Sequence, residues 1–226
     1  MRVIEIFYSL QGEGFLAGVP SVFVRLAGCP LRCRWCDTQY AWDVGGGKYY
    51  SIERIADEAA KFNCRHVVVT GGEPMVNEDL PQLLRELKAR EKHITVETAG
   101  IEFIADLACD LMSISPKLSN SVPADKLLAH RHEQARFNLA ELKTLVANYD
   151  YQLKFVVDSP EDLPEIEETL EQLGDVDKGK VMLMPQAKTR QELLEKSGMV
   201  AQLCRQFGYA FSQRLQVMLW NNQRGR

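Results

Sequence analysis

Three cysteines stand close together near the start of the sequence, at Cys29, Cys33 and Cys36, in the spacing C-x3-C-x2-C. Thiolates bind zinc and iron–sulfur clusters, so this spacing predicts a metal site. A structural zinc ion takes four ligands, but the nearest histidine, His66, is followed by an apolar run typical of a buried strand. Three thiolates on a 4Fe–4S cluster would leave one iron open, as a catalytic metal requires. The spacing alone supports zinc and iron–sulfur equally.

Charged residues in or beside apolar runs are the next candidates for chemistry. Arg25 lies in such a run, where an unpaired guanidinium is costly, so we expect a carboxylate partner. That partner is either a ligand or a structural residue, for which Glu13, Glu97 and Asp37 are the candidates. Glu97 is itself either a substrate contact or the partner of a positive charge. Lys117 is either a site residue or a solvated charge at the end of a strand.

Composition limits the class of protein. The chain has 226 residues, 46% of them hydrophobic, so it can bury a full core, and we expect one domain over residues 1–226. The net charge of -4 comes from interspersed acids and bases, which predicts neither a nucleic-acid nor a membrane surface. No apolar stretch approaches the ~20 residues of a membrane span, and the first residues lack a signal-peptide core. We therefore expect a cytoplasmic protein.

The same compartment favours metal binding over disulfides, because thiols stay reduced there. The other three cysteines, Cys64, Cys109 and Cys204, lie far apart in apolar or helical surroundings. We interpret them as small buried hydrophobic side chains.

Apolar, β-branched runs alternate with segments of helical periodicity, which predicts an α/β fold with a parallel sheet. Strands are expected at Val22–Leu26, Val67–Val69, Ile94–Val96, Leu111–Ile114, Leu153–Val157 and Val181–Met184, with outlying candidates at Val3–Tyr8 and Leu215–Leu219. Helices are expected at Ile52–Phe62, Leu80–Arg90 and Gln134–Ala147, with two more opened by Ser159 and by Thr189.

Short polar signatures directly follow six of the expected strands, beginning with the cysteines and continuing to Pro185-Gln186. In a parallel sheet they would meet at the carboxyl ends of the strands, where barrel enzymes keep their chemistry. Six contributing strands favour a curved, barrel-like sheet over a crevice between two strands. Because the chain is shorter than the ~250 residues of a complete eightfold barrel, we expect a partial TIM-type barrel, mostly parallel, with outer helices.

The cysteine triplet, Trp35 and the segment Gly71-Gly72-Glu73-Pro74 together resemble the radical S-adenosylmethionine (SAM) superfamily. The resemblance implies that Cys29, Cys33 and Cys36 hold a 4Fe–4S cluster whose open iron binds SAM. An electron from the cluster would break a carbon–sulfur bond of SAM, and the resulting 5′-deoxyadenosyl radical would take hydrogen from the substrate.

A narrower resemblance covers nearly the whole chain and points to the 7-carboxy-7-deazaguanine synthases. The matching segments are Glu5–Phe7, Leu10–Gly14, Gly18-x-Pro20, Arg25-Leu26-x-Gly28-Cys29, Cys36–Thr38, Val69–Pro74, Glu97-Thr98 and Ser115–Lys117. Members of this family are partial-barrel homodimers that use magnesium and an external electron donor such as flavodoxin. They convert 6-carboxy-5,6,7,8-tetrahydropterin to 7-carboxy-7-deazaguanine with loss of ammonia, on the path to queuosine and other 7-deazapurines.

The resemblance also implies roles for individual residues. SAM would contact Trp35, Cys36, Asp37, Gly71, Gly72, Glu73, Ser115, Pro116, Lys117 and Gln186. The pterin would contact Leu10, Gln11, Gly12, Glu13, Arg25, Thr70 and Glu97, with Arg25 on its carboxylate. Thr38 would give one oxygen to Mg2+, which prefers hard oxygen ligands. No catalytic residue is implied beyond these cofactor and substrate ligands.

Other interpretations remain open. On residue types alone, the glycine-containing segments at 11–14 and 71–72 are tight turns. The cysteine triplet also fits a radical SAM enzyme that makes a glycyl radical on a partner protein, and a non-catalytic zinc-binding module. The residues from Leu215 onwards differ from the Gln-Thr-His-Lys ending of some family members, so the resemblance assigns them no role.

Overall fold

The computed structural model describes residues 1–221 and 223–226. Within these residues the chain forms one nine-stranded sheet in the order β3-β1-β2-β4-β5-β6-β7-β8-β9. The strands are β1 (Arg2–Leu10), β2 (Pro20–Leu26), β3 (Lys48–Tyr49), β4 (His66–Gly71), β5 (His93–Thr98), β6 (Leu111–Ile114), β7 (Tyr151–Val157), β8 (Val181–Pro185) and β9 (Ala210–Phe211).

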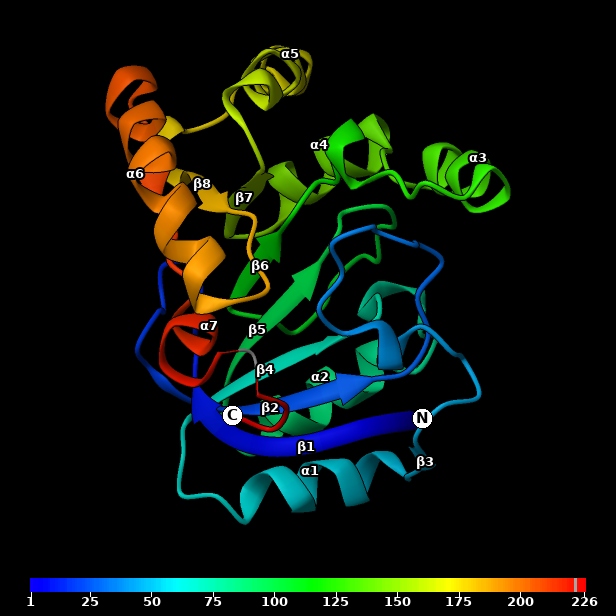
Figure 1. Cartoon of the computed structure of the whole chain (residues 1–226). Helices are drawn as coiled ribbons and strands as arrows, with labels where there is room; N and C mark the ends of the chain where they lie inside the picture. Colours follow the sequence, from blue (N-terminus) through cyan, green and yellow to red (C-terminus); the bar gives the residue numbers. More distant parts are fainter. Residues whose placement is uncertain (222) are drawn as a thin grey trace.

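The sheet is mostly parallel and does not close on itself. Strands β2 and β4 to β9 pair in parallel, whereas β1 runs antiparallel to both of its neighbours, β2 and β3. The two edge strands, β3 and β9, are short, and the curved sheet between them leaves an open side (Figure 1). The predicted partial barrel is therefore confirmed.

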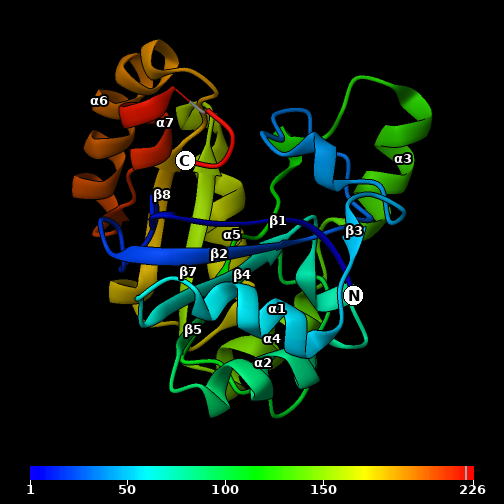
Figure 2. The ribbon, with the colours of Figure 1, turned by 90° about the horizontal axis from the view of Figure 1, so that it is seen from below.

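Helices connect the parallel strands. They are α1 (Ile52–Ala60), α2 (Leu80–Ala89), α3 (Lys126–Ala135), α4 (Leu139–Asn148), α5 (Leu163–Leu173), α6 (Arg190–Phe207) and α7 (Leu215–Trp220). Figures 1 and 2 show α1, α2 and α6 on the outer side of the curved sheet. The predicted caps are present, because Ser51 accepts a bond from Arg54 N, and Thr189 forms a capping box with Glu192. No helix in the described part of the chain combines the length and the apolar character needed to cross a membrane.

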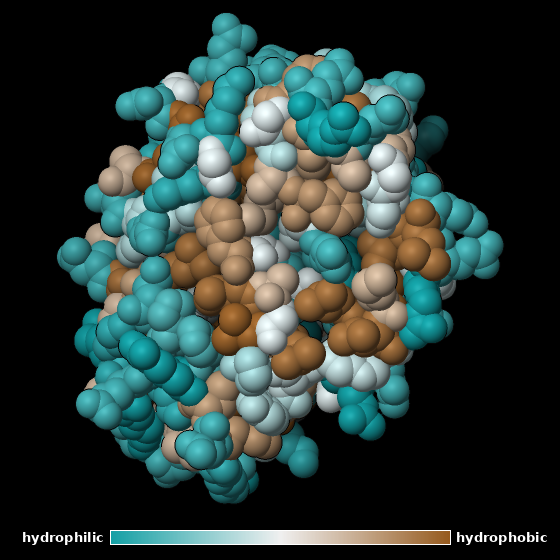
Figure 3. All heavy atoms as spheres, turned by 90° about the vertical axis from the view of Figure 1, so that its left-hand side faces the viewer, coloured by the Kyte–Doolittle hydropathy of each residue, from teal (hydrophilic) through white to brown (hydrophobic). Residues whose placement is uncertain are grey.

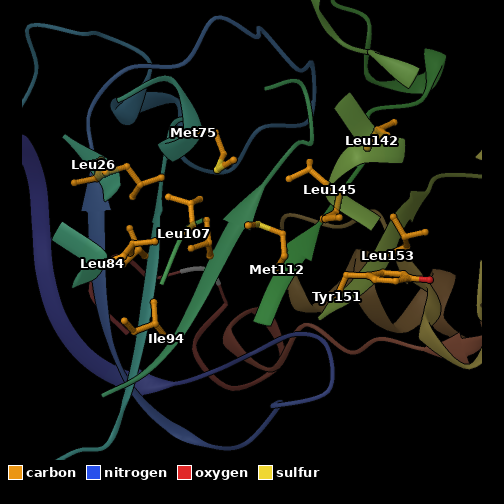
Figure 4. Packing of buried hydrophobic residues seen from close by; sticks show 14 of the residues in the cluster. Leu26, Met75, Leu84, Ile94, Leu107, Met112, Leu142, Leu145, Tyr151 and Leu153 are labelled. Atoms are coloured by element: carbon orange, nitrogen blue, oxygen red, sulfur yellow. The ribbon is translucent and has the colours of Figure 1, made fainter. Parts of the chain in front are cut away.

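The hydrophobic core fills the space between the outer face of the sheet and the helices. Successive residues of a strand point to opposite faces, so alternate positions of each strand reach this core. Leu26, Met112 and Leu153 enter it from the strands, and Leu84 and Leu145 meet them from α2 and α4 (Figure 4). All five of these side chains are completely shielded from solvent, which fixes the register of the strands and hence of the loops that follow them.

Two of the predicted elements differ in the structure. Leu215–Leu219 lies in helix α7 and is not a strand, because only Val217 of this apolar run is buried and the chain turns at Arg214. The expected helix at Gln134–Ala147 is two helices, α3 and α4, separated by three residues. Asn138 starts the second one by accepting a bond from Glu141 N, so the helical periodicity concealed a break.

Candidate active site

One cavity of about 280 Å³ collects the side chains that the sequence singled out. It is lined by residues at the carboxyl ends of the parallel strands and by the loops that follow them. Of the predicted site residues, the cavity lining includes Leu10, Gln11, Gly12, Glu13, Arg25, Cys29, Cys33, Trp35, Cys36, Asp37, Thr38, Thr70, Gly71, Gly72, Glu73, Glu97, Ser115 and Lys117. Pro116 and Gln186 are not part of this lining, and Gln186 instead accepts a bond from Lys196 at 2.7 Å.

The loop after β2 carries the three cysteines as free thiols. Cys33 is buried, and Cys29 and Cys36 are partly buried beside Leu31 and Trp35. Burial raises the pKa of Cys29 to about 12 and that of Cys33 to about 11. These thiols therefore stay protonated at neutral pH unless a positively charged centre binds and displaces the protons.

The three thiols fit an iron–sulfur cluster better than a single ion. Among the described residues, no group of three or more His, Cys, Asp or Glu side chains converges closely enough to hold one metal ion. Thiolates on separate irons of a cluster stand farther apart than the ligands of a single zinc ion. Three thiols on one loop suit a cluster that keeps one of its irons open.

Backbone hydrogen bonds fix the cysteine loop to its neighbours. Gly28 N donates to Ala41 O at 2.9 Å, and Arg32 N donates to Nδ1 of the fully buried His132 at 3.0 Å. The other ring nitrogen of His132 lies 2.9 Å from Ser121 Oγ. The loop is therefore anchored to α3 by bonds within the protein.

The turn Gly71-Gly72-Glu73-Pro74 packs directly on the cysteine loop. Glu73 N donates to Gly28 O at 2.8 Å, and Gly72 N donates to Leu26 O at 3.2 Å. A Cβ atom on Gly72 would stand 2.2 Å from Gly28 O, a separation that no side chain tolerates. Glycine is needed here because two backbones approach each other, and the turn and the loop form one wall of the cavity.

The Glu73 carboxylate is a structural element of that wall. It accepts bonds from Thr98 Oγ1 and Ala99 N, both at 2.7 Å, and from Met75 N at 3.1 Å. Burial raises the pKa of Glu73, although the hydrogen bonds from these donors act to lower it. Because its oxygens are already engaged, the side chain holds the turn to the end of β5, which leaves backbone atoms of the turn to face a ligand.

Lys117 belongs to the cavity and is not a freely solvated charge. Its ammonium nitrogen lies 5.8 Å from the centre of the Trp35 ring and donates to Ser115 Oγ at 2.9 Å. The ammonium group therefore gives the wall beside the cysteine loop a positive charge.

The inner face of the sheet carries a buried chain of alternating charges. Lys154, only 1% exposed in the middle of β7, donates to Glu97 at 2.8 Å and to Glu13 at 3.0 Å. Arg214 lies within 3.2 Å of Glu13 and 2.5 Å of Asp37. Burial alone would raise the pKa of Glu13, but Lys154 and Arg214 lower it to about 2. Both glutamates that the sequence assigned to substrate are thus held in place by cations.

Arg25 has a partner that the sequence did not indicate. The expected Glu13, Glu97 and Asp37 bind other cations, whereas Arg25 Nε donates to Glu5 at 2.8 Å. Glu5 stands directly opposite Arg25 in the antiparallel pairing of β1 with β2. Arg25 thus has a carboxylate partner within the protein, but this partner is Glu5 and none of the three expected residues. Because Arg25 also lines the cavity, its predicted contact with the substrate stays a prediction.

The sequence analysis gave no role to four residues that the structure places in the ion pairs and hydrogen bonds at the cavity, namely Glu5, Lys154, Arg214 and Gln216. The sequence does contain a signal for Lys154, because this residue, like Arg25, is a charged side chain inside an apolar run and therefore needs a partner of opposite charge. Gln216 and Arg214 were hidden by the incorrect strand at Leu215–Leu219.

Comparisons with known proteins agree with this geometry. The sequence profile of the Radical SAM superfamily matches residues 24–136. A curated 7-carboxy-7-deazaguanine synthase from Halobacterium salinarum is 43% identical over 98% of this chain and 91% of its own length. One from Rhodopirellula baltica is 39% identical over 100% of this chain and 88% of its own length.

The fold is also similar to that of a solved structure. The crystal structure of QueE from Escherichia coli aligns with a TM-score of 0.71 at 24% identity, covering 93% of this chain and 92% of the other. At that identity the likeness concerns the fold. It is consistent with the partial barrel described above.

Proposed function

Since the chain belongs to the 7-carboxy-7-deazaguanine synthases of the radical SAM superfamily, we propose that its cavity converts 6-carboxy-5,6,7,8-tetrahydropterin to 7-carboxy-7-deazaguanine. The pterin loses one nitrogen and three hydrogens as ammonia, and SAM is regenerated, so the reaction balances without another reactant. The observation that carries the proposal is the convergence of Cys29, Cys33, Cys36, Glu13 and Arg25 on one cavity.

The cofactor half of the cavity would be formed by the cysteine loop and the wall beside it. Cys29, Cys33 and Cys36 would hold the 4Fe–4S cluster, which with SAM supplies the radical that takes hydrogen from the substrate. The backbone of Gly72 would contact the SAM amino group, and Lys117 would face its carboxylate. The apolar side chains around the thiols exclude water from this half of the site.

The substrate half would be formed by the inner face of the sheet. In the described part of the chain, no hydrogen bond occupies the terminal nitrogens of Arg25, so they remain to grip the pterin carboxylate. Glu13 and Glu97, which line the cavity and already accept bonds from protein donors, would offer their remaining lone pairs to the N–H groups of the pterin ring. Gln11, which donates to Glu97 at 3.1 Å, orients one of them. Buried charges matched to a substrate reject analogues that lack its donors.

Magnesium fits the cavity only together with the substrate. This proposal is supported by Thr38, which lines the cavity and carries a hydroxyl oxygen 3.7 Å from Cys36 Sγ. One hydroxyl is too few ligands for Mg2+, so the pterin carboxylate and water would complete the octahedron.

The remaining proposals concern assembly and surroundings. A homodimer is supported by the apolar side chains exposed near α6 and α7, among them Leu194 at 61%, Phe15 at 47% and Leu219 at 47% exposure. Figure 3 shows apolar surface gathered on the face that includes these elements. An external donor such as flavodoxin would reduce the cluster. We propose the cytoplasm as the location, because thiols such as the three cysteines stay reduced there.

The deciding experiment is an anaerobic incubation of the reconstituted protein with dithionite, SAM, Mg2+ and the carboxytetrahydropterin, followed by mass analysis. We expect 7-carboxy-7-deazaguanine and ammonia in equal amounts, with little SAM consumed. A protein that cleaves SAM without forming this product would instead support the glycyl-radical activating enzyme. A colourless protein containing zinc but no iron or sulfide would support the zinc module.

A further inference from the structure

Arg214 joins three segments that are distant in the sequence. Its guanidinium donates to Glu13 at 3.2 Å, to Asp37 at 2.5 Å and to the backbone oxygen of Ala187. The residue is 8% exposed, so these bonds form away from bulk water. A planar guanidinium can serve several acceptors in fixed directions, which a lysine ammonium cannot do with the same geometry.

The two carboxylates that Arg214 joins belong to different halves of the cavity. Asp37 directly follows the cluster ligand Cys36, and Glu13 faces the proposed pterin site. Among the described residues, Arg214 is the sole hydrogen-bond donor to the Asp37 carboxylate. Glu13, by contrast, also receives bonds from Lys154 and Gln216. The bridge therefore matters most for the position of the cluster loop.

The segment around Arg214 is fixed to the turn that bears Glu13. Leu215 N donates to Gly12 O at 3.0 Å, Gln216 Nε2 donates to Glu13 at 2.8 Å, and Gly14 N donates to Ser212 Oγ at 3.0 Å. A Cβ atom on Gly12 would meet Gln216 Oε1 at 1.8 Å, so the contact needs glycine. Arg214 thus stands on a rigid base beside the substrate wall and reaches from it to the cysteine loop.

From this arrangement we propose that Arg214 is a positioning residue that couples the pterin site to the cluster loop, setting the distance between the substrate and the radical. The inference rests on the proposed function. It adds a link between the substrate half and the cofactor half of the cavity. A substrate that hydrogen-bonds to Glu13 competes with Arg214 for this carboxylate, which changes the bond from Arg214 to Asp37 and so the position of the adjoining Cys36. Binding of the pterin should accordingly be sensed at the cluster.

Two measurements test the coupling in the reconstituted, full-length protein. The first is the electron paramagnetic resonance signal of the reduced cluster with SAM, recorded with and without the carboxytetrahydropterin. The second is the ratio of 5′-deoxyadenosine released to 7-carboxy-7-deazaguanine formed, which rises when the radical is made but misses the substrate. A residue that acts only on stability lowers both products together and leaves the ratio unchanged.

The variants are Arg214→Met, Arg214→Lys and Asp37→Ala. Arg190→Met is the matched control, because Arg190 ties α6 to the backbone oxygens of Met218 and Leu219 in α7 and touches neither carboxylate. We expect the carboxytetrahydropterin to change the electron paramagnetic resonance signal of wild type and of Arg190→Met. The signal of Arg214→Met should stay the same with and without this substrate. The ratio should rise about tenfold in Arg214→Met and in Asp37→Ala, and less in Arg214→Lys, which can reach only one carboxylate.

If Arg214→Met does not fold, Asp37→Ala still tests the coupling. This variant removes the bond between Arg214 and Asp37 and leaves Arg214 bound to Glu13. The proposal is overturned if the substrate still changes the signal in the bridge variants and the product ratio stays at the wild-type value. Failure of the proposed function would look different, because the wild-type protein itself would then form no 7-carboxy-7-deazaguanine.

Discussion

The outer and inner faces of the sheet are built from alternating residues of the same strands, yet their chemistry is opposite. On β7, Leu153 and Phe155 enter the apolar core, whereas Lys154 between them lies among carboxylates at the cavity. On β2, Val24 is fully buried in the core and its neighbour Arg25 lines the cavity. The comparison teaches that one face specifies the fold and the other specifies the reaction, at positions one residue apart.

The two faces also differ in how they tolerate change. Apolar side chains on the outer face contribute through area removed from water, so their loss is graded by size. Charges on the inner face are stable only as a set, since removing one member leaves its partners buried and uncompensated. Substitutions at neighbouring positions should therefore separate loss of fold from loss of chemistry.

The largest effect is expected from Cys33→Ala, which tests whether the cavity can lose its chemistry while the core persists. With one of three thiolates gone, the cluster should not assemble, and turnover should be abolished. Iron and sulfide analysis after reconstitution measures this loss, and circular dichroism checks the fold. Full iron content in the variant would contradict the assignment of the three cysteines.

Lys154→Met should be the most damaging change on the inner face for stability. It removes the ammonium between Glu13 and Glu97 while keeping the length of the side chain. Breaking a buried ion pair in this way costs about 3–5 kcal/mol. Urea unfolding of the protein without its cofactors measures the change. An unchanged unfolding free energy would mean that the charges of the inner face are not mutually dependent.

The neighbouring substitution Leu153→Ala should have a somewhat smaller effect on stability and a different effect on function. Leu153 is completely buried in the core, and truncating such a leucine costs about 3 kcal/mol. The cavity does not contain this side chain, so kcat and KM of the folded fraction should remain near wild type. A selective loss of kcat in Leu153→Ala would remove the distinction between the two faces.

Acidification should act on the inner face first, with a smaller effect. The pKa of Glu13 in the folded protein is about 2, below its ordinary value of 4.5, so its stabilising effect is complete above pH 4.5. As pH falls from 4.5 through 2, that stabilisation is progressively lost, because protonated Glu13 no longer pairs with the cations. Urea unfolding over this range, compared with Glu13→Gln, measures it. The difference between the two proteins should shrink toward pH 2, and a constant difference would contradict the assignment.

The same division explains what could be predicted from sequence. Periodicity and β-branched runs located six parallel strands and the partial barrel, because the outer face follows hydrophobic patterning. The polar segments after the strands located the cavity, since the carboxyl ends of parallel strands must meet. The ion pairs could not be predicted in the same way. Arg25 meets Glu5 through the register of two strands, and Arg214 reaches Asp37 across most of the chain.

The most direct test is an anaerobic crystal structure with the cluster, SAM and the carboxytetrahydropterin bound. The account predicts a 4Fe–4S cluster held by Cys29, Cys33 and Cys36, with SAM on its fourth iron. It also predicts the pterin against the inner face, its carboxylate on Arg25. A protein side chain on the fourth iron, or a pterin bound away from Glu13 and Arg25, would contradict it.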